Sequence, residues 1–166
     1  MSEDAPKHAL KLPALDPRDV TRRIGGGYPE PFNEAVGERR KRALTRALGL
    51  TRFGVNVTEL PPGAASALRH WHTHEDEFVY VLQGHPTLVT ERGTQTLAPG
   101  QVAGFPAGVA DGHCFENRSD ETVILLEVGS RDPSDEGHYP DHDLHVHPGR
   151  YGAPARFTRK NGDPLD

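Results

Sequence analysis

The chain has 166 residues, a hydrophobic content of 34% and a formal net charge of −5 at pH 7. This is the size of one domain with a core of its own, and the acidic balance argues against wholesale nucleic-acid binding. With one cysteine, no signal-peptide segment and no apolar run that could cross a membrane, we expect a cytoplasmic protein without a disulfide framework or a cysteine-based zinc site.

The first 49 residues are predicted to form an arm followed by one surface helix. Residues 1–31 are rich in proline, glycine and charge, which indicates an extended segment. The helix is predicted over 33–48, because Asn33 is a suitable N-cap and Gly49 a suitable stop. The basic run ERRKR within it would be a solvated helix face or a DNA-binding element. We favour the solvated face, since a single short helix makes no helix-turn-helix.

From residue 50 to 130 the sequence changes to short β-type segments bounded by turn residues. Alternating or β-branched runs predict strands near 53–60, 66–72, 77–83, 86–91, 94–97, 101–105, 113–117 and 122–128. Short strands at this spacing are typical of an antiparallel sandwich or barrel. Residues 131–166 are again rich in proline, glycine and charge. They are predicted to form a second arm that packs on the barrel, so that the chain makes one globular domain.

The segment 69–84, RHWHTHEDEFVYVLQG, carries the strongest chemical signal. His70 and His72 occupy alternate positions of a predicted strand, so their imidazoles point to one face about 6.6–6.8 Å apart. Glu77 can join them only if residues 73–76 form a turn. Imidazole with carboxylate is a ligand set for zinc, iron, manganese or nickel. The alternative is a solvated, acidic hairpin end that binds no metal.

A second segment, residues 99–117, supplies a further histidine. A glycine turn, a strand and a Pro-x-Gly turn lead into a strand that opens with His113, whose side chain would share a face with Phe115. Two hairpins from opposite walls of a barrel could bring His113 to the first segment. On its own, His113 would be an ordinary core or surface residue.

The first segment resembles the first signature motif of the cupin superfamily, which is H-x-H, three or four residues, E, six residues and G. Here the motif reads His70-x-His72, four residues, Glu77, six residues and Gly84. His74 offers a competing frame with a shorter gap to Glu77, and only the His70 frame has the family's spacing. The remaining polar residues of the turn, including both of its acids, are then expected at the rim.

The second segment resembles the second cupin motif, which is G, five residues, P-x-G, two residues, H, three residues and N. Here it reads Gly100, five residues, Pro106-x-Gly108, four residues instead of two, His113, three residues and Asn117. The loop before His113 is therefore longer than the family's pattern.

The resemblance implies an all-β fold, the antiparallel double-stranded β-helix or jelly-roll barrel of the cupins, with one N-terminal helix and extended arms at both ends. It also implies one divalent metal ion per chain (zinc, iron, manganese or nickel), bound at His70, His72, Glu77 and His113. Phrases such as EDEFVYVL and AGFPAG are similar to a group of small bacterial single-domain cupins, mostly without an assigned substrate.

Two functions follow from this resemblance. The chain would be a metalloenzyme acting on a small sugar, keto acid or aromatic molecule, as an isomerase, a decarboxylase or a dioxygenase. Alternatively it would be a metal-stabilised module that binds or senses a small ligand. A metal-free barrel is disfavoured because the chain has a metal-binding residue type at all four ligand positions of the family. Candidates for moving protons are His74, Tyr80 and Asp111, and the expected pocket-lining residues are Val79, Phe105 and Phe115.

Strand 77–83 is predicted to be apolar on both faces beyond its first residue. One face would lie in the barrel and the other against an arm, the helix or a second subunit. Together with the long arms, this predicts a homodimer.

The C-terminal segment HYPDHDLHVH is rich in histidine: His138, His142, His145 and His147. His145 and His147 could share a strand face, joined by Asp141 or Asp143, and bind a second metal ion. The alternative is a hydrophilic arm without a metal.

Overall fold

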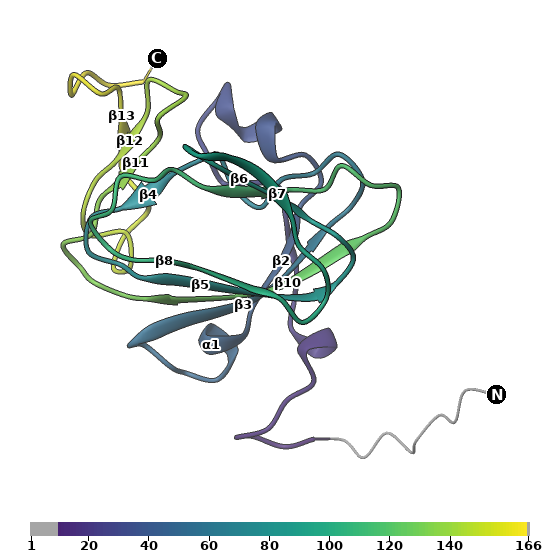
Figure 1. The fold of residues 1–166 in the computed structure, drawn as a ribbon. Coiled ribbons are helices and arrows are strands. Elements are labelled where there is room, and N and C mark those ends of the chain that lie inside the picture. The colour runs from purple at the N-terminus through teal and green to yellow at the C-terminus, as the bar shows by residue number, and fades with distance from the viewer. Residues whose placement is uncertain (1–9, 166) are drawn as a thin grey trace.

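The fold is built from three antiparallel sheets that together form a barrel (Figure 1). The computed structural model describes residues 10–165. The strand orders are β1-β2-β3-β10-β5-β8, β13-β12-β11-β4 and β7-β6-β9. In chain order the elements are η1 (Pro17–Asp19), β1 (Arg23–Ile24), η2 (Phe32–Val36), β2 (Arg40–Ala43), α1 (Leu44–Ala47), β3 (Phe53–Leu60), β4 (Trp71–His72), β5 (Glu77–Gln83), β6 (Thr87–Thr90), β7 (Gly93–Thr96), β8 (Val102–Phe105), β9 (Cys114–Glu116), β10 (Val123–Ser130), β11 (Gly137–His138), β12 (His145–Val146) and β13 (Phe157–Thr158).

Alternation along β5 separates the barrel interior from its outer surface. Val79 and Val81 are only 7% and 0% exposed, whereas Phe78, Tyr80 and Leu82 on the other face are 41%, 37% and 47% exposed. Burial of a valine side chain contributes roughly 1.5–3 kcal/mol. The interior residues belong to one core cluster: Leu60, Ala64, Val79, Val81, Leu88, Leu97, Phe115, Val123 and Leu125.

The predicted strand at 66–72 is shortened to the two residues of β4. Upstream of β4 the chain bends, and its contacts with the β9 region are isolated bridges, Ala65 to Glu116 and His70 to His113. Ser66 replaces regular pairing by accepting a hydrogen bond from the Phe115 amide with its hydroxyl, at 2.9 Å. The other predicted strands are confirmed to within a few residues.

The extent of the helix predicted over 33–48 is wrong, since only Leu44–Ala47 of this segment is α-helical. Gly37 has φ 60° and ψ −147°, which ends the short 3-10 helix η2 and starts an extended path. The basic residues that follow form β2, which pairs with β3. Arg42 makes an ion pair with Glu59 of β3. Pairing with the sheet therefore overrides the helix propensity of this run, and α1 keeps only one helical turn.

The C-terminal arm extends the barrel wall as a small sheet of its own. The strands β11, β12 and β13 pair in that order onto β4. Beneath them lies a second core cluster: Leu68, Tyr139, Leu144 and Val146.

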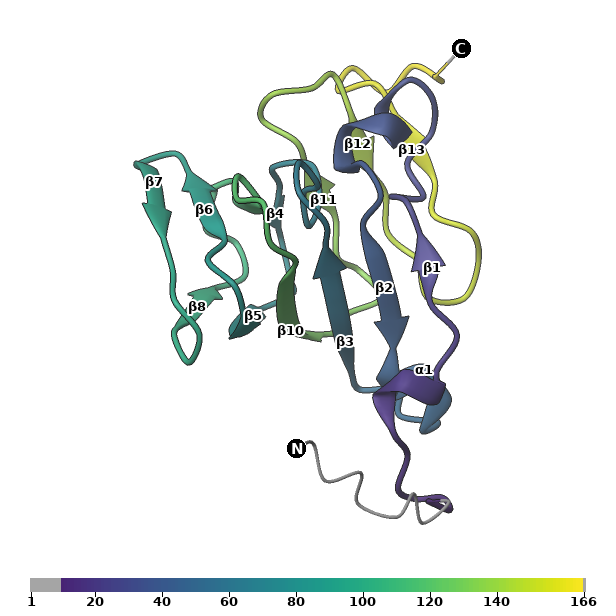
Figure 2. The same cartoon turned by 90° about the vertical axis from the view of Figure 1, so that its right-hand side faces the viewer.

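Figure 2 shows β10, β3, β2 and β1 side by side, so part of the predicted N-terminal arm also joins the sheet. Residues 1–9 of that arm and Asp166 lie outside the described residues. Within residues 10–165, no helix has the length and apolar character needed to span a membrane.

Gly84, the last residue of the first motif, follows β5 in a conformation that disfavours a side chain. Its φ is +76°, and a Cβ there would lie 2.9 Å from Val123 Cγ2 and 3.1 Å from the Thr122 carbonyl oxygen. We expect Gly84→Ala to lower the free energy of unfolding by about 2 kcal/mol, through backbone strain and overpacking.

Urea denaturation measures this effect, with Gly152→Ala as the matched control. A Cβ at Gly152 meets no atom within 4 Å. Similar loss of stability in both variants would contradict the explanation based on Gly84.

Candidate metal centre

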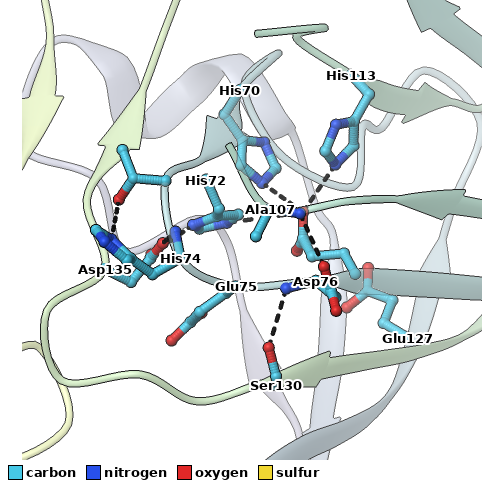
Figure 3. Close-up of polar contacts among 12 residues, drawn as sticks. His70, His72, His74, Glu75, Asp76, Ala107, His113, Glu127, Ser130 and Asp135 are labelled. Atoms are coloured by element: carbon cyan, nitrogen blue, oxygen red, sulfur yellow. Dashed lines mark hydrogen bonds and ion pairs between the residues drawn. The ribbon is translucent and has the colours of Figure 1, made fainter. Parts of the chain in front are cut away.

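Three histidine side chains converge on one carboxylate oxygen, Oε2 of Glu77. The Nε2 atoms of His113, His70 and His72 lie 2.8, 3.4 and 3.6 Å from Oε2 of Glu77. Figure 3 shows the three imidazoles approaching a common point from different sides. The structure thus brings together the four residues of the two motifs, which we call the ligand cluster.

The backbone sets these positions. His70 and His113 exchange reciprocal backbone hydrogen bonds of 3.1 and 2.8 Å, which place their side chains next to each other. Between β4 and β5 the chain turns, as predicted, and Asp76 fastens this turn. Its amide donates to the Ser130 hydroxyl at 2.9 Å and its carboxylate accepts from the Ala107 amide at 2.8 Å (Figure 3). The turn therefore brings Glu77 back toward the histidines.

Hydrogen bonds made by the Nδ1 atoms of the histidines leave the lone pairs of their Nε2 atoms directed at Glu77. Nδ1 of His70 donates to the Leu68 carbonyl oxygen at 2.8 Å, and Nδ1 of His72 donates to Oδ2 of Asp135 at 2.7 Å. A proton on Nδ1 leaves Nε2 as the acceptor or metal-ligating atom. Nδ1 of His113 lies 3.4 Å from a backbone carbonyl oxygen, so the same arrangement is available to it.

The electrostatics of the ligand cluster favour a cation. Burial alone would raise the pKa of the Glu77 carboxyl, but His70, His113 and His72 outweigh burial and hold that pKa well below its ordinary value. Burial lowers the pKa of His70 more than the Glu77 carboxylate raises it. A partly buried carboxylate beside imidazole nitrogens is the donor set of a divalent transition metal. Donor type, burial and ring orientation therefore fit a metal ion.

The two carboxylates of a neighbouring cluster, formed by His72, Glu75 and Asp135, are already paired with Arg150. Nη1 of Arg150 lies 2.6 Å from Oδ2 of Asp135, and its Nη2 forms an ion pair with Glu75. Glu75 also accepts from the Tyr151 hydroxyl at 2.5 Å and is only 4% exposed. The expectation that both acids of the turn lie at the rim is therefore wrong for Glu75. This Arg150 cluster orients His72 and joins the C-terminal arm to the site.

The low pKa of Asp135 gives a testable pH dependence. Burial would raise it, but the hydrogen bonds from His72 and the His74 amide and the pairing with Arg150 lower it to about 2. Because the folded value lies below the ordinary one, Asp135 stabilises the fold above about pH 4, by about 2 kcal/mol. That contribution is lost as the pH falls from about 4 toward 2.

Urea denaturation of the wild type and of Asp135→Asn across pH 2–6 measures this contribution. We expect the two stabilities to converge as the pH falls toward 2, because Asp135 is by then protonated in the unfolded chain and becomes protonated in the folded one. A gap that stays constant across this window would contradict the prediction.

Two cavities meet at the ligand cluster. The larger has a volume of about 980 Å³ and is lined by His72, Glu77 and His113, together with Phe105. The Phe105 ring stacks on the His113 ring, with centroids 3.5 Å apart. The smaller, of about 410 Å³, is lined by the whole ligand cluster and by the basic residues Arg23, Arg39, Lys41, Arg131 and Arg150. The other two predicted pocket residues, Val79 and Phe115, also line the smaller cavity.

Of the three residues predicted as candidates for proton transfer, only Asp111 lines a cavity at the ligand cluster. Tyr80 lies on the outer face of β5, away from the ligand cluster. His74 is exposed, with Nδ1 2.8 Å from the Thr73 hydroxyl. Asp111 lines the larger cavity, and its carboxylate accepts from the Glu91 amide at 3.0 Å.

Cys114 follows His113 and is buried at 5% exposure. Burial, with the nearby charge of Glu116, raises the pKa of its thiol to about 12. The side chain is therefore a neutral packing residue at physiological pH.

Comparison with known proteins places this architecture in one family. The family described as Cupin domain matches residues 56–129. The crystal structure of a Silicibacter pomeroyi protein, described as a sugar phosphate isomerase from a cupin superfamily, is 44% identical, with a TM-score of 0.87 over 93% of this chain and 97% of that chain. An Acidithiobacillus ferrooxidans protein, provisionally described as a sugar phosphate isomerase, is 28% identical, with a TM-score of 0.71 over 87% of this chain and 90% of that one.

A predicted oxalate decarboxylase from Thermotoga maritima shares the fold at 20% identity, with a TM-score of 0.59 over 70% of this chain and 97% of that chain. The comparison with curated proteins gives no match. The paired motifs, the antiparallel barrel and the 44% identity over 93% of the chain all indicate the same family. The chain belongs to the cupin superfamily.

Proposed function

We propose that this protein is a mononuclear, metal-dependent enzyme that isomerises a sugar phosphate. The observation that carries the proposal is the convergence of three imidazole Nε2 atoms on Oε2 of Glu77 at the junction of two cavities. Four protein ligands leave positions open on an ion of higher coordination number. When bound, such an ion would supply Lewis acidity at the oxygen atoms of an open-chain sugar.

The reaction class is supported by similarity and the substrate class by charge. The Silicibacter pomeroyi relative is 44% identical and is described as a sugar phosphate isomerase. Because one fold supports many reactions, the site must add its own argument. The smaller cavity is lined by five basic side chains and three acidic ones, Glu75, Glu77 and Glu127, in a chain whose net charge is −5. A local excess of positive charge favours an anionic substrate.

The phosphate group is best placed beside Arg23 and Lys41. These two residues lie directly opposite each other on β1 and β2, and both line the smaller cavity. Like charges in directly opposite positions repel. Glu127 pairs with Lys41 at 2.7 Å, which leaves the Arg23 guanidinium for an anion. A phosphate there would pair with the charge of Arg23 and accept hydrogen bonds from its guanidinium.

The test is turnover by protein purified without a His-tag and loaded with metal. We expect it to interconvert aldose and ketose phosphates, to ignore the same sugars without phosphate, and to lose activity on chelation. Tight binding of sugar phosphates without turnover would instead support the ligand-binding module.

A pair of variants tests the phosphate position. Arg23→Gln is expected to raise KM by about tenfold or more, the loss of one charged hydrogen bond, without changing metal content. Arg92→Gln, which alters the larger cavity, is the matched control and should leave KM unchanged. The opposite pattern would place the phosphate in the larger cavity.

We also propose that two copies associate through the outer face of β5 and β8. Phe78, Tyr80, Leu82 and Val102 are 41%, 37%, 47% and 52% exposed, and Tyr80 lies directly opposite Val102. An exposed patch of contiguous apolar side chains marks an interaction surface, and one patch repeated on both copies suits a two-fold interface.

Light scattering over a range of concentrations tests the association. We expect a dimer for the wild type and a monomer for Leu82→Glu. The control, Val109→Glu, changes an exposed residue outside this face and should remain dimeric. A monomeric wild type would contradict the proposal.

A further inference from the structure

A second group of metal-type side chains lies on the outer face of the four-stranded sheet. It consists of Glu136, His138 and His145, which we call the outer cluster. One ligand atom from each residue lies within 4.8 Å of the others. Nε2 of His145 is 3.1 Å from Oε2 of Glu136. We propose that the outer cluster binds a divalent metal ion, with zinc as the best match, independently of the ligand cluster inside the barrel.

Strand register explains why the two histidines meet. His138 on β11 lies directly opposite His145 on β12, and their ring centroids are 4.8 Å apart. Directly opposite residues of antiparallel strands keep their Cβ atoms about 4.5–5.5 Å apart, which sets both rings on one face. On its other side, His138 lies opposite Trp71 of β4, and the indole stacks on the imidazole at 4.3 Å and 15°. The sheet therefore orients His138 from both sides.

The outer cluster has the donor chemistry and the access that an ion needs. The side chains of His145 and Glu136 are 14% and 38% exposed, so solvent reaches the group. Burial, with the nearby His145, lowers the pKa of His138, which leaves this imidazole neutral near pH 7. Zinc bonded to nitrogen and oxygen at about 2.0–2.2 Å holds its ligands about 3.3 Å apart, a separation that small side-chain rotations can reach. Water would complete the coordination.

Other polar residues of this segment have partners of their own. The imidazole of His142 packs edge-on against Phe32, with centroids 5.4 Å apart. Nε2 of His147 lies 2.8 Å from the Thr158 hydroxyl, and its ring borders the outer cluster, 4.6 Å from the His145 ring. Asp141 forms an ion pair of 2.6 Å with Arg69. The sequence suggested a site of His145 and His147 with one of two aspartates. The structure instead groups His145 with His138, and the carboxylate comes from Glu136.

Consecutive residues of one segment serve the two metal-type clusters. Asp135 accepts a hydrogen bond from His72 at 2.7 Å, inside the barrel. Glu136 and His138 point to the outer face. An ion held by the outer cluster would tie β11 to β12 and would keep Asp135 in place against His72. We infer a structural role for this ion, as a clip that holds the first two strands of the C-terminal arm together.

Zinc stoichiometry is the direct test. Metal-free wild-type protein without a tag is titrated with zinc at pH 7.5 by calorimetry, and the bound metal is counted after gel filtration. We expect two zinc ions per chain for the wild type, one for His138→Ala, one for His70→Ala, and none for the double variant. Glu136→Gln should weaken the outer site by about tenfold or more.

The matched control is His142→Ala, which removes a histidine from the same tail. It should bind two ions, and circular dichroism checks that every variant is folded. A wild type that binds one ion and keeps it in His138→Ala would overturn the proposal. So would equal loss in the control variant.

Hydrogen exchange separates a clip from a passive surface site. With the wild type, zinc should slow the exchange of the β11 and β12 amides by about tenfold or more, since the ion opposes local opening. His138→Ala should show no such slowing. Equal exchange with and without zinc in the wild type would contradict the structural role.

Discussion

Replacing Arg150 with methionine is expected to lower the free energy of unfolding by about 3–5 kcal/mol, the typical cost of removing one partner from a buried ion pair. The guanidinium of Arg150 is the cation that pairs with both Glu75 and Asp135, whose side chains are 5% and 0% exposed. Without it, two carboxylates would stay buried next to each other. The C-terminal arm should then detach before the barrel unfolds.

Urea denaturation compares this variant with Arg118→Met. Arg118 pairs with Glu116 at 2.7 Å, but those side chains are 54% and 37% exposed, so its loss should cost about 1 kcal/mol or less. Adding Glu75→Gln and Asp135→Asn to Arg150→Met should recover much of the lost stability, because the uncompensated charges are removed. Equal effects of the two arginine variants would show that the Arg150 cluster is not the link we describe.

Replacing Glu77 with glutamine is expected to weaken metal binding at the ligand cluster by about 100-fold or more. Replacing a residue that only hydrogen-bonds to a metal ligand already lowers metal affinity by about 10–100-fold. Glu77 supplies the negative charge to which the three imidazoles converge, 2.8 to 3.6 Å from its Oε2 atom. Glutamine keeps the shape and removes the charge. The amide also offers a weaker ligand oxygen.

Calorimetric titration in a His138→Ala background measures this change without a contribution from the outer cluster. The matched control is Glu121→Gln, a glutamate outside both clusters, which should bind as the parent does. The metal affinity of Asp135→Asn should lie between those of the two variants. This change removes no ligand and weakens only the hydrogen bond that orients His72. Undiminished affinity in Glu77→Gln would rule out its role as a ligand.

Local patterns predicted the barrel well because its strands alternate strongly. Along β5 the side chains on one face are almost completely buried and those on the other are exposed, so a one-residue error of register would have been visible. The resemblance of the two segments to the cupin motifs likewise predicted the four residues that converge, although His113 lies 36 residues from Glu77.

Residues that depend on distant partners could not be predicted in the same way. Glu75 looked like a rim residue because the cation that buries it, Arg150, lies in the arm 75 residues away. Asp135 is 63 residues from His72 and belongs to no motif. The segment 33–48 has good helix formers, and only the available edge of β3 explains why part of it is a strand. The failures therefore share one cause, which is tertiary pairing without a local signal.

The buried thiol beside the ligand cluster offers a way to observe motion at the site. Cys114 is the single cysteine of the chain, and it lies in β9 immediately after His113. At 5% exposure, it can meet a thiol reagent only when β9 separates from its neighbours. The rate of alkylation therefore reports how often the strand that carries one ligand opens. This measurement needs no introduced label, because the native thiol reports local opening next to His113.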